Sequence, residues 1–475
     1  MKSILVIKFG GTSIGTPHAM DQAAKIVAAE HERVPLVVVS AFCGVTDRLV
    51  GLADEARCGD LAAIAETHHF LKHRHLDQAH ALLSGEAFGT YAALFTQHWS
   101  QLRDRVNAMG QCRSCSVEEQ DGLLSFGEWA CSRLFCLVLG ERGVAVSWCD
   151  SRELLVTDDR FGNASPQLDA TTNRLQEIAS PILEAGTTVV TQGFIGTSNC
   201  GRTTTLGRGG SDYSATLFAS LLNAQEVHIR TDVDGVFSAD PNLINAALGV
   251  PELNLEEAYD LANYGAEVLY PPCLEPLRQN GIPLRVCNTF TPDNPGTLIS
   301  AKLGPDPNRF FISLQQDRTL IQLACPDGAC GQRFSQSLFG NVRSHLDRLD
   351  SVTFHDTDVC LITGSDSSQF LQAVSEQVRL VEVVPLALIH IFGGDPEFKL
   401  MIQQQCHSVL AGIGVPIRFF GSIGAKKHFL FGVALKHGPN AARALHHNFC
   451  EQPQKVTGLS EFEVRDPDLI PLPVL

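Results

Sequence analysis

The most informative stretch of this 475-residue chain is GRTTTLGRGGSD, residues 201–212. The β-branched run at 188–191 that precedes it predicts a buried strand, and apolar positions at helical spacing predict a helix over 213–225. Its glycines allow positive φ and close approach to a ligand, and Ser211 and Asp212 are suited to cap the helix. A strand, a glycine loop and a helix N-terminus together direct backbone N–H groups at an anion.

Two similar patterns lie nearer the N-terminus. Residues 3–8 form an apolar run that ends in Lys8 and is followed by Gly10 and Gly11, with a helical pattern beyond. Residues 36–40 form a second apolar run, which ends in Ser40 and has Thr46 shortly after it. Such alternation predicts an α/β fold with a mainly parallel sheet, in which ligands bind at the carboxyl ends of the strands.

Three further features complete the candidate site. Arg208 lies inside the glycine loop, where a guanidinium group can grip a carboxylate or a phosphate in two places. Glu128 lies in an apolar helical run, FGEWACSRLF, where a carboxylate needs either solvent or a counter-charge. Residues 227–230 predict a strand that leads into TDVDG, where Thr231 and Asp232 could contact a nucleotide or Mg²⁺, or form a simple turn.

Composition narrows the functional classes. The formal net charge of −16 argues against a nucleic-acid or membrane-surface partner, and no apolar run is long enough for an evident membrane span. Without an export signal, the 15 cysteines are expected to be reduced thiols in a cytoplasm. His69 and His73 have the spacing of a metal pair, but without a third ligand a solvated helix face is the better interpretation, so no protein metal site is assigned.

Loop-rich sequence at 291–297 and 304–308 marks a domain boundary. Beyond it, strands are predicted at 311–314, 319–324, 352–354, 358–363, 381–384, 386–392, 416–420 and 428–433, with helices at 335–346, 367–378, 398–413 and 438–448. Two successive patterns close to β-α-β-β-α-β indicate two small ferredoxin-like domains, followed by a loosely held tail over 452–475.

By these motifs the chain resembles the aspartokinases, of the amino-acid kinase superfamily. The motifs are KFGGTS (8–13), VVVSAFCGVT (37–46), FGE (126–128), TQGFIG (191–196), GRTTTLGRGGSD (201–212), TDVDG (231–235) and VLYP (268–271), in the family's order. The resemblance implies an amino-acid-kinase αβα sandwich over 1–303 and two ACT domains over 304–385 and 386–451. It also implies Mg²⁺- and ATP-dependent phosphorylation of the β-carboxylate of L-aspartate.

The same resemblance assigns roles to residues. Lys8 and Asp212 would be catalytic. The amino-acid site would be formed by Ser40, Thr46, Glu128, Arg208 and Ser211, and the nucleotide site by Lys8, Gly10, Gly11, Thr231, Asp232, Phe237, Asn242 and Glu267. Three of these depart from the family pattern, since Glu267 stands where the family often has Lys, and Phe237 and Asn242 replace common Tyr and Arg residues.

Tandem ACT domains imply feedback by a pathway end product, with lysine the first expectation, in a homodimer or a dimer of dimers. Two alternatives stay open from the sequence. The protein could be another amino-acid kinase, for example one acting on glutamate. It could also be a catalytically silent amino-acid sensor. The departures from the family pattern at Glu267, Phe237 and Asn242 suggest this alternative.

Overall fold

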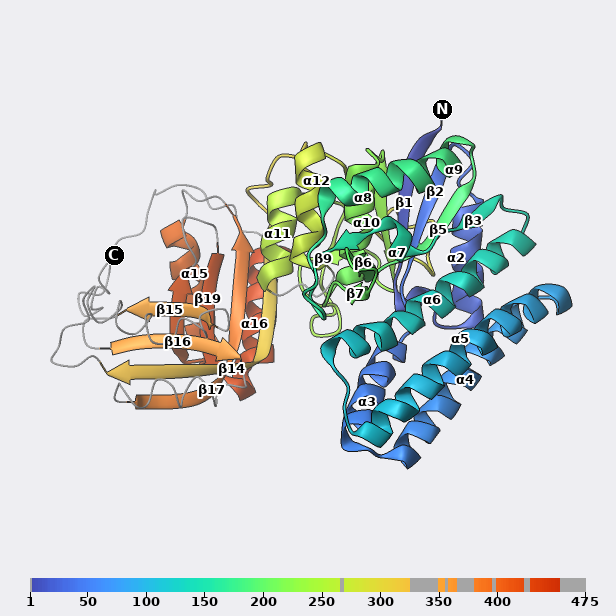
Figure 1. Cartoon of the computed structure of the whole chain (residues 1–475). Helices are drawn as coiled ribbons and strands as arrows, with labels where there is room; N and C mark the ends of the chain where they lie inside the picture. The colour runs from blue at the N-terminus through green and yellow to red at the C-terminus, as the bar shows by residue number, and fades with distance from the viewer. Residues whose placement is uncertain are drawn as a thin grey trace, which may run out of the picture. The chain divides into compact units, whose positions relative to one another are not determined.

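The computed structural model describes residues 2–264, 269–324, 349–354, 358–364, 380–394, 399–422 and 428–452. The chain divides into two compact units. The first consists of Met1–Asp240 with Ala247–Pro305, and the second of Pro241–Ala246 with Asp306–Leu475. Figure 1 shows the elements of each unit.

An eight-stranded sheet, in the order β11-β13-β12-β8-β1-β2-β5-β3, forms the centre of the first unit. Its strands are β1 (Ser3–Phe9), β2 (Arg33–Val39), β3 (Val146–Trp148), β5 (Thr188–Gln192), β8 (Glu226–Thr231), β11 (Glu252–Asn254), β12 (Leu284–Asn288) and β13 (Thr297–Ser300). Neighbouring strands from β12 to β3 run parallel, and β12 pairs with β13 antiparallel. The predicted mainly parallel sheet is therefore confirmed.

Helices lie on both faces of this sheet (Figure 1). The helices of this unit are α1 (Gly11–Ile14), α2 (Pro17–Ala28), α3 (Val45–Cys58), α4 (Leu61–Leu82), α5 (Gly85–Cys112), α6 (Val117–Glu141), α7 (Ser151–Leu154), α8 (Leu168–Arg174), a π-helical turn (Leu175–Ala179), α9 (Ser180–Glu184), α10 (Gly210–Leu221), α11 (Leu255–Tyr264), a 3₁₀ turn (Pro271–Leu274) and α12 (Glu275–Asn280). Of these, α3, α4 and α5 pack on other helices. Smaller sheets join β4 (Val156–Thr157), β6 (Ile195–Ser198) and β7 (Thr203–Thr205), and β9 (Val236–Phe237) with β10 (Gly249–Val250).

The alternation of side chains along β1 places Lys8 in the site. Leu5, Ile7 and Phe9 point into the main core, which they share with buried residues of α2 to α6. Because successive strand side chains point to opposite faces, Lys8 points to the other face, where α10 packs against β1. One strand thus supplies both core residues and a cation.

Two details of the helices differ from the sequence-based expectations. Helix α10 begins at Gly210, and its N-cap is Gly209 in the left-handed conformation (φ 68°), so Ser211 and Asp212 lie in the first turn and do not cap it. A Cβ at position 209 would come within 2.2 Å of Tyr270 Cγ, so glycine is required there on steric grounds as well.

Helix α6 is the second difference. Among the described residues it is long and apolar enough to cross a membrane, but 78% of its apolar window is buried inside the protein, as in a core helix.

In α4, His69 and His73 are exposed as expected, whereas His68 and His75 are buried. Burial lowers the pKa of each of these two imidazoles to about 4, so both are neutral.

A six-stranded antiparallel sheet, in the order β15-β16-β14-β17-β19-β18, dominates the second unit. Its elements are β14 (Phe310–Ala324), β15 (Leu349–Phe354), β16 (Asp358–Gly364), β17 (Leu380–Gly393), α15 (Lys399–Gly412), β18 (Ile417–Ser422), β19 (His428–Ala434), a 3₁₀ turn (Leu435–His437), α16 (Gly438–His446) and a π-helical turn (His447–Glu451). This sheet is consistent with ACT domains. The helices predicted at 335–346 and 367–378, and the tail from 453, lie outside the described residues.

Two pairs of predicted strands are single long strands in the structure. Residues 310–315 of β14 pair with 388–393 of β17, and after a register shift 318–323 pair with 380–386. Pro385 is tolerated within β17 because β19 pairs with β17 only from Leu386 onwards. Both long strands therefore serve both halves of the sheet, and the boundary between two ACT domains near 385 stays a prediction.

Candidate active site

Lys8 and Asp212 meet where the carboxyl end of β1 faces the first turn of α10. Lys8 Nζ lies 2.6 Å from Asp212 Oδ1, and the two side chains are only 12% and 16% exposed. A Cβ on Gly10 would lie 3.6 Å from Lys8 Nζ, so the ammonium group lies beside the glycine loop. The structure thus brings together a cation, a carboxylate and a helix N-terminus, which is suited to bind and orient an anion.

The loops that leave β1 and β2 are packed together. Gly10 N donates to Arg230 O at 3.1 Å, and Ser40 N donates to Phe9 O at 3.2 Å. A Cβ on Gly11 would approach Ala41 O to 2.8 Å, which explains the need for glycine at this close crossing. Ser40 directly follows β2, Thr46 lies in the first turn of α3, and both are half-buried.

Glu128 is buried on α6, directly behind this crossing. Its side chain is 3% exposed, and burial raises its pKa to about 8 even though the Ala41 backbone N–H donates to it. Its second oxygen, Oε2, has no hydrogen-bond partner among the described residues. A buried carboxyl with an unused oxygen is costly unless a donor arrives from outside, so this group is a strong candidate to meet a cationic part of a substrate.

The two remaining candidates of the glycine loop, Ser211 and Arg208, lie in different environments. Ser211 packs against the loop after β5, since a Cβ on Gly193 would come within 2.7 Å of Ser211 Cα. Arg208 is exposed and makes no hydrogen bond or ion pair with the residues that the structure describes. Its guanidinium group therefore keeps all its donors for a ligand.

The predicted nucleotide residues are placed only in part. Thr231 ends β8 and donates through Oγ1 to Asp232 Oδ1 at 3.1 Å, and Asp232 is exposed. Phe237 lies in β9, opposite Gly249 of β10. Asn242 belongs to the second compact unit, and Glu267 lies outside the described residues.

Several supporting residues were not singled out from the sequence. Ser13 Oγ donates to Arg230 O at 3.1 Å and accepts from Thr289 Oγ1 at 2.7 Å, which ties the first glycine loop to the ends of β8 and β12. Cys273 is buried close enough to Lys8 and Asp212 to interact with both electrostatically, and burial raises the pKa of its thiol. Ser13 lay within the KFGGTS motif, whereas Cys273 gave no sequence signal.

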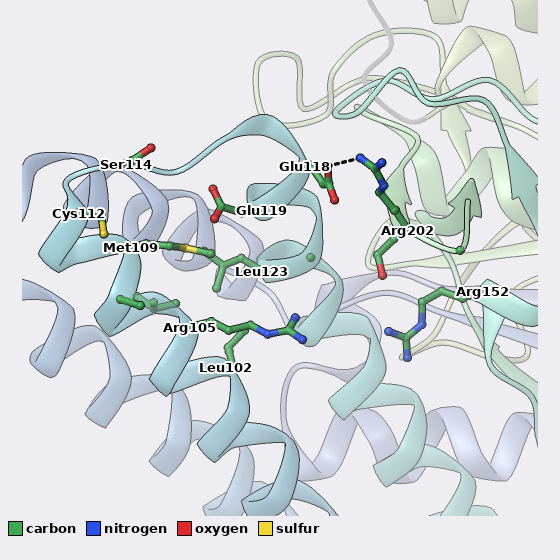
Figure 2. Close-up of a pocket in the computed structure, with 15 residues that line it drawn as sticks. Leu102, Arg105, Met109, Cys112, Ser114, Glu118, Glu119, Leu123, Arg152 and Arg202 are labelled. Atoms are coloured by element: carbon green, nitrogen blue, oxygen red, sulfur yellow. Dashed lines mark hydrogen bonds and ion pairs between the residues drawn. The ribbon is translucent and has the colours of Figure 1, made fainter. Parts of the chain in front are cut away.

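A cavity of about 780 Å³ lies elsewhere in the first unit, between α5, the start of α6 and the loop that joins β6 to β7 (Figure 2). None of the predicted site residues lines it. Cys112 lines this cavity and Cys115 is buried nearby on the same connection, and both are free thiols.

Comparison with known proteins identifies the class of protein. The amino acid kinase family matches residues 3–288, so the chain belongs to that family. Lysine-sensitive aspartokinase 3 of Escherichia coli (strain K12) is 32% identical over 467 residues, covering 95% of this chain and all of the relative. An aspartokinase of Chlamydia pneumoniae is 34% identical over 349 residues, covering 72% of this chain and 73% of the relative. Within the amino acid kinases, the chain therefore belongs to the aspartokinases.

Solved structures agree with this assignment. The crystal structure of E. coli aspartokinase III in complex with aspartate and ADP matches with a TM-score of 0.79 at 31% identity, over 93% of this chain and 99% of that one. The same enzyme in complex with lysine and aspartate matches with a TM-score of 0.78, also at 31% identity, over 94% of this chain and 99% of that one. The predicted fold is thus confirmed.

Proposed function

We propose that this protein is an aspartate kinase, which transfers the γ-phosphoryl group of Mg-ATP to the β-carboxylate of L-aspartate. The products are 4-phospho-L-aspartate and ADP, in the first step of lysine, threonine and methionine biosynthesis. The observation that carries the proposal is the Lys8–Asp212 pair, 2.6 Å apart, between a glycine loop and a helix N-terminus. Full-length relatives that are aspartokinases supply the substrate class.

The reaction needs charge neutralisation more than a general base. A carboxylate oxygen of aspartate attacks the γ-phosphorus, and the bond from that phosphorus to the bridging oxygen of ADP breaks. Both reactants are anions, so a cation near the transferring group is the main requirement. Lys8 supplies that charge, Asp212 holds its ammonium group in place, and we assign the N–H group of Gly11 to the phosphates, because Gly10 N already donates to Arg230 O.

On the amino-acid side, we assign the ammonium group of aspartate to Glu128 and a carboxylate to Arg208. The unpartnered Glu128 Oε2 and the unpaired Arg208 guanidinium are the observations that support these roles. Ser40, Thr46 and Ser211 lie at the same edge of the sheet and complete this half of the site with hydroxyl groups.

On the nucleotide side, we assign Thr231, the last residue of β8, together with Asp232 and Phe237, which follow it along the chain. Mg²⁺ enters as part of Mg-ATP and neutralises phosphate charge. The nucleotide roles of Asn242 and Glu267 stay predictions. The similarity to a lysine-sensitive relative supports lysine as the feedback effector, acting through the second unit of a cytoplasmic homodimer or dimer of dimers.

The test is an assay of the full chain with Mg-ATP and either L-aspartate or L-glutamate, in which hydroxylamine traps the acyl phosphate. Hydroxamate that depends on aspartate, and is lost in Lys8→Ala, is the expected result. Hydroxamate from glutamate alone would make the protein another amino-acid kinase. The absence of turnover, with thermal stabilisation by an amino acid, would make it a silent sensor. Repeating the assay with lysine, threonine and methionine identifies the effector.

A further inference from the structure

The cavity of about 780 Å³ shown in Figure 2 has an apolar floor. Leu102 and Val106 come from α5 and Leu123 from α6, and all three are buried. Met109, one turn further along α5, adds a flexible apolar side chain. This floor suits a hydrocarbon body of a few carbon atoms.

Two arginines face each other above this floor. Figure 2 shows the guanidinium groups of Arg105, on α5, and Arg152, on α7, pointing toward one another. Arg105 makes no hydrogen bond or ion pair with the described residues. Arg152 donates to Asp150 through Nε at 2.9 Å and Nη2 at 2.5 Å, which leaves its Nη1 donors unused.

The other charges around the cavity are already engaged. Arg202 Nη1 lies 2.7 Å from Glu118 Oε2, and this pair links the loop between β6 and β7 to the start of α6. Glu119 accepts from Ser116 N and Oγ in the capping box of α6. Arg152 is likewise paired with Asp150, so Arg105 is the lining arginine that has no carboxylate partner among the described residues, and Arg152 Nη1 adds unused donors.

We propose that this cavity is a second ligand site, which binds a small carboxylate with an apolar body. The carboxylate lies between Arg105 and Arg152, where planar guanidinium groups can hold it in two places, and the apolar body covers Leu102, Val106 and Leu123. A simple carboxylic acid and an apolar α-amino acid share this chemistry. Binding at this site does not depend on the proposed function.

A connection from this site to the catalytic loop runs through Asp121. This buried residue precedes Gly122, which lines the cavity, and accepts from Thr205 N at 2.9 Å and Thr205 Oγ1 at 2.7 Å. Thr205 ends β7 and leads directly to Arg208 and Asp212.

The test is calorimetric titration of the full chain with 4-methylpentanoate and with L-leucine, at saturating aspartate so that the catalytic site is filled. The neutral 4-methylpentanamide is the ligand control. We expect Arg105→Gln, which keeps the length of the side chain but not its charge, to weaken binding at least tenfold. Arg103→Gln is the matched control, because Arg103 lies on the same helix and pairs with Asp104. Ala108→Trp, which adds bulk at the cavity wall without a change of charge, should also weaken binding.

Binding of 4-methylpentanoate, of leucine or of both supports the site, and which of the two binds distinguishes the two sources of the carboxylate. No binding of either up to about 10 mM, equal binding of the amide, or unchanged binding in Arg105→Gln overturns it. Failure of the proposed function is separate, because it would show as absent hydroxamate while this binding persists.

Discussion

The two ends of the central strands differ in how completely their charged side chains are paired. At the amino ends, Glu226 opens β8 and is contacted by Arg33 at 2.9 Å, Arg285 at 3.0 Å and His228 at 3.3 Å. Although burial raises the pKa of Glu226, His228 and Arg285 lower it to about 2. At the carboxyl ends, Glu128 Oε2 and Arg208 have no partners among the described residues.

This difference distinguishes a structural cluster from a binding site. Glu226 is surrounded by three basic side chains of the protein itself, so its contribution is to stability. Charges that the fold brings together but leaves incomplete cost stability until a substrate arrives. Substitutions at the amino ends should therefore affect unfolding, and substitutions at the carboxyl ends should affect kinetics.

The largest effect is expected for Lys8→Ala. Removing the cation beside the transferring phosphoryl group should lower kcat about 10²–10³-fold, with the KM for aspartate nearly unchanged, because this charge acts mainly in the transition state. Steady-state kinetics measure it. Lys25→Ala is the control, since Lys25 pairs with Asp21 on the surface of α2. A large rise in KM with unchanged kcat would refute the assigned role.

Glu226→Gln should have the next largest effect, on stability. Loss of the charge leaves Arg33 and Arg285 poorly compensated, and we expect the free energy of unfolding to fall by about 2 kcal/mol, less than for a fully buried pair. Because the folded-state pKa is lowered, this contribution is present above about pH 4.5 and is lost as the pH falls towards 2. Urea unfolding at pH 7 and pH 3 measures it, with exposed Glu153→Gln as control. A changed kcat would contradict the assignment of Glu226 to a purely structural cluster.

Arg208→Ala should act on substrate binding. Loss of a charge-assisted pair with a substrate carboxylate should raise the KM for aspartate about 10–100-fold. Stability should not change, because Arg208 makes no contact of this kind with the described residues. Arg160→Ala, which removes an exposed arginine paired with Asp158, is the control. Equal KM values for Arg208→Ala and the unchanged enzyme would remove Arg208 from the amino-acid site.

Much of this site could be predicted from the sequence, for physical reasons. The apolar runs before Lys8 and Ser40 have the length and alternation of buried parallel strands, and the glycines at 11, 209 and 210 mark close approaches that leave no room for a side chain. The helix start was wrong because Gly209 and Ser211 are both acceptable caps, and only the contact with Tyr270 decides between them. The burial of His68 and His75 depends on α5 and α6, which local sequence does not reveal.

The pH dependence of aspartate binding tests Glu128. With a pKa of about 8, its carboxyl is mostly protonated at pH 7 before substrate binds, yet it must be ionised to pair with an ammonium group. We expect the KM for aspartate to fall by up to tenfold per pH unit between pH 6 and 8 and then to level off. Glu128→Gln should raise the KM and flatten this profile.

The same group gives a stability test of opposite sign to Glu226. Its folded-state pKa is raised, so the protein is most stable, as far as Glu128 is concerned, below about pH 4.5, and it loses stability as the pH rises to about 8. Glu128→Gln should therefore resist urea better than the unchanged protein at pH 9 and equally well at pH 5. A variant that is less stable at pH 9 would show that the ionised carboxylate is satisfied within the protein.

The smallest expected effect comes from the layer behind the first glycine loop. Gln78 on α4 donates through Nε2 to Ile14 O at 2.8 Å, and Arg74 donates to Gly15 O at 2.6 Å. These bonds hold α1, which follows Gly10. They should therefore contribute both to stability and to the geometry of the site, two roles that belong to different residues at the two ends of the strands. Gln78→Met preserves volume but leaves a buried carbonyl unsatisfied, and should lower the free energy of unfolding by about 1 kcal/mol.

The kinetic consequence should be a severalfold rise in the KM for ATP with little change for aspartate, because the displaced loop faces the phosphates. Exposed Asp77→Asn on the same helix is the control. A loss of stability with unchanged KM for ATP would class Gln78 with Glu226 as purely structural. A rise in the KM for ATP without loss of stability would mean that the Arg74 bond alone stabilises the loop. Gln78 would then affect only the conformation of that loop. Only a loss of stability together with a higher KM for ATP would show that these residues both stabilise the fold and maintain the geometry of the phosphate site.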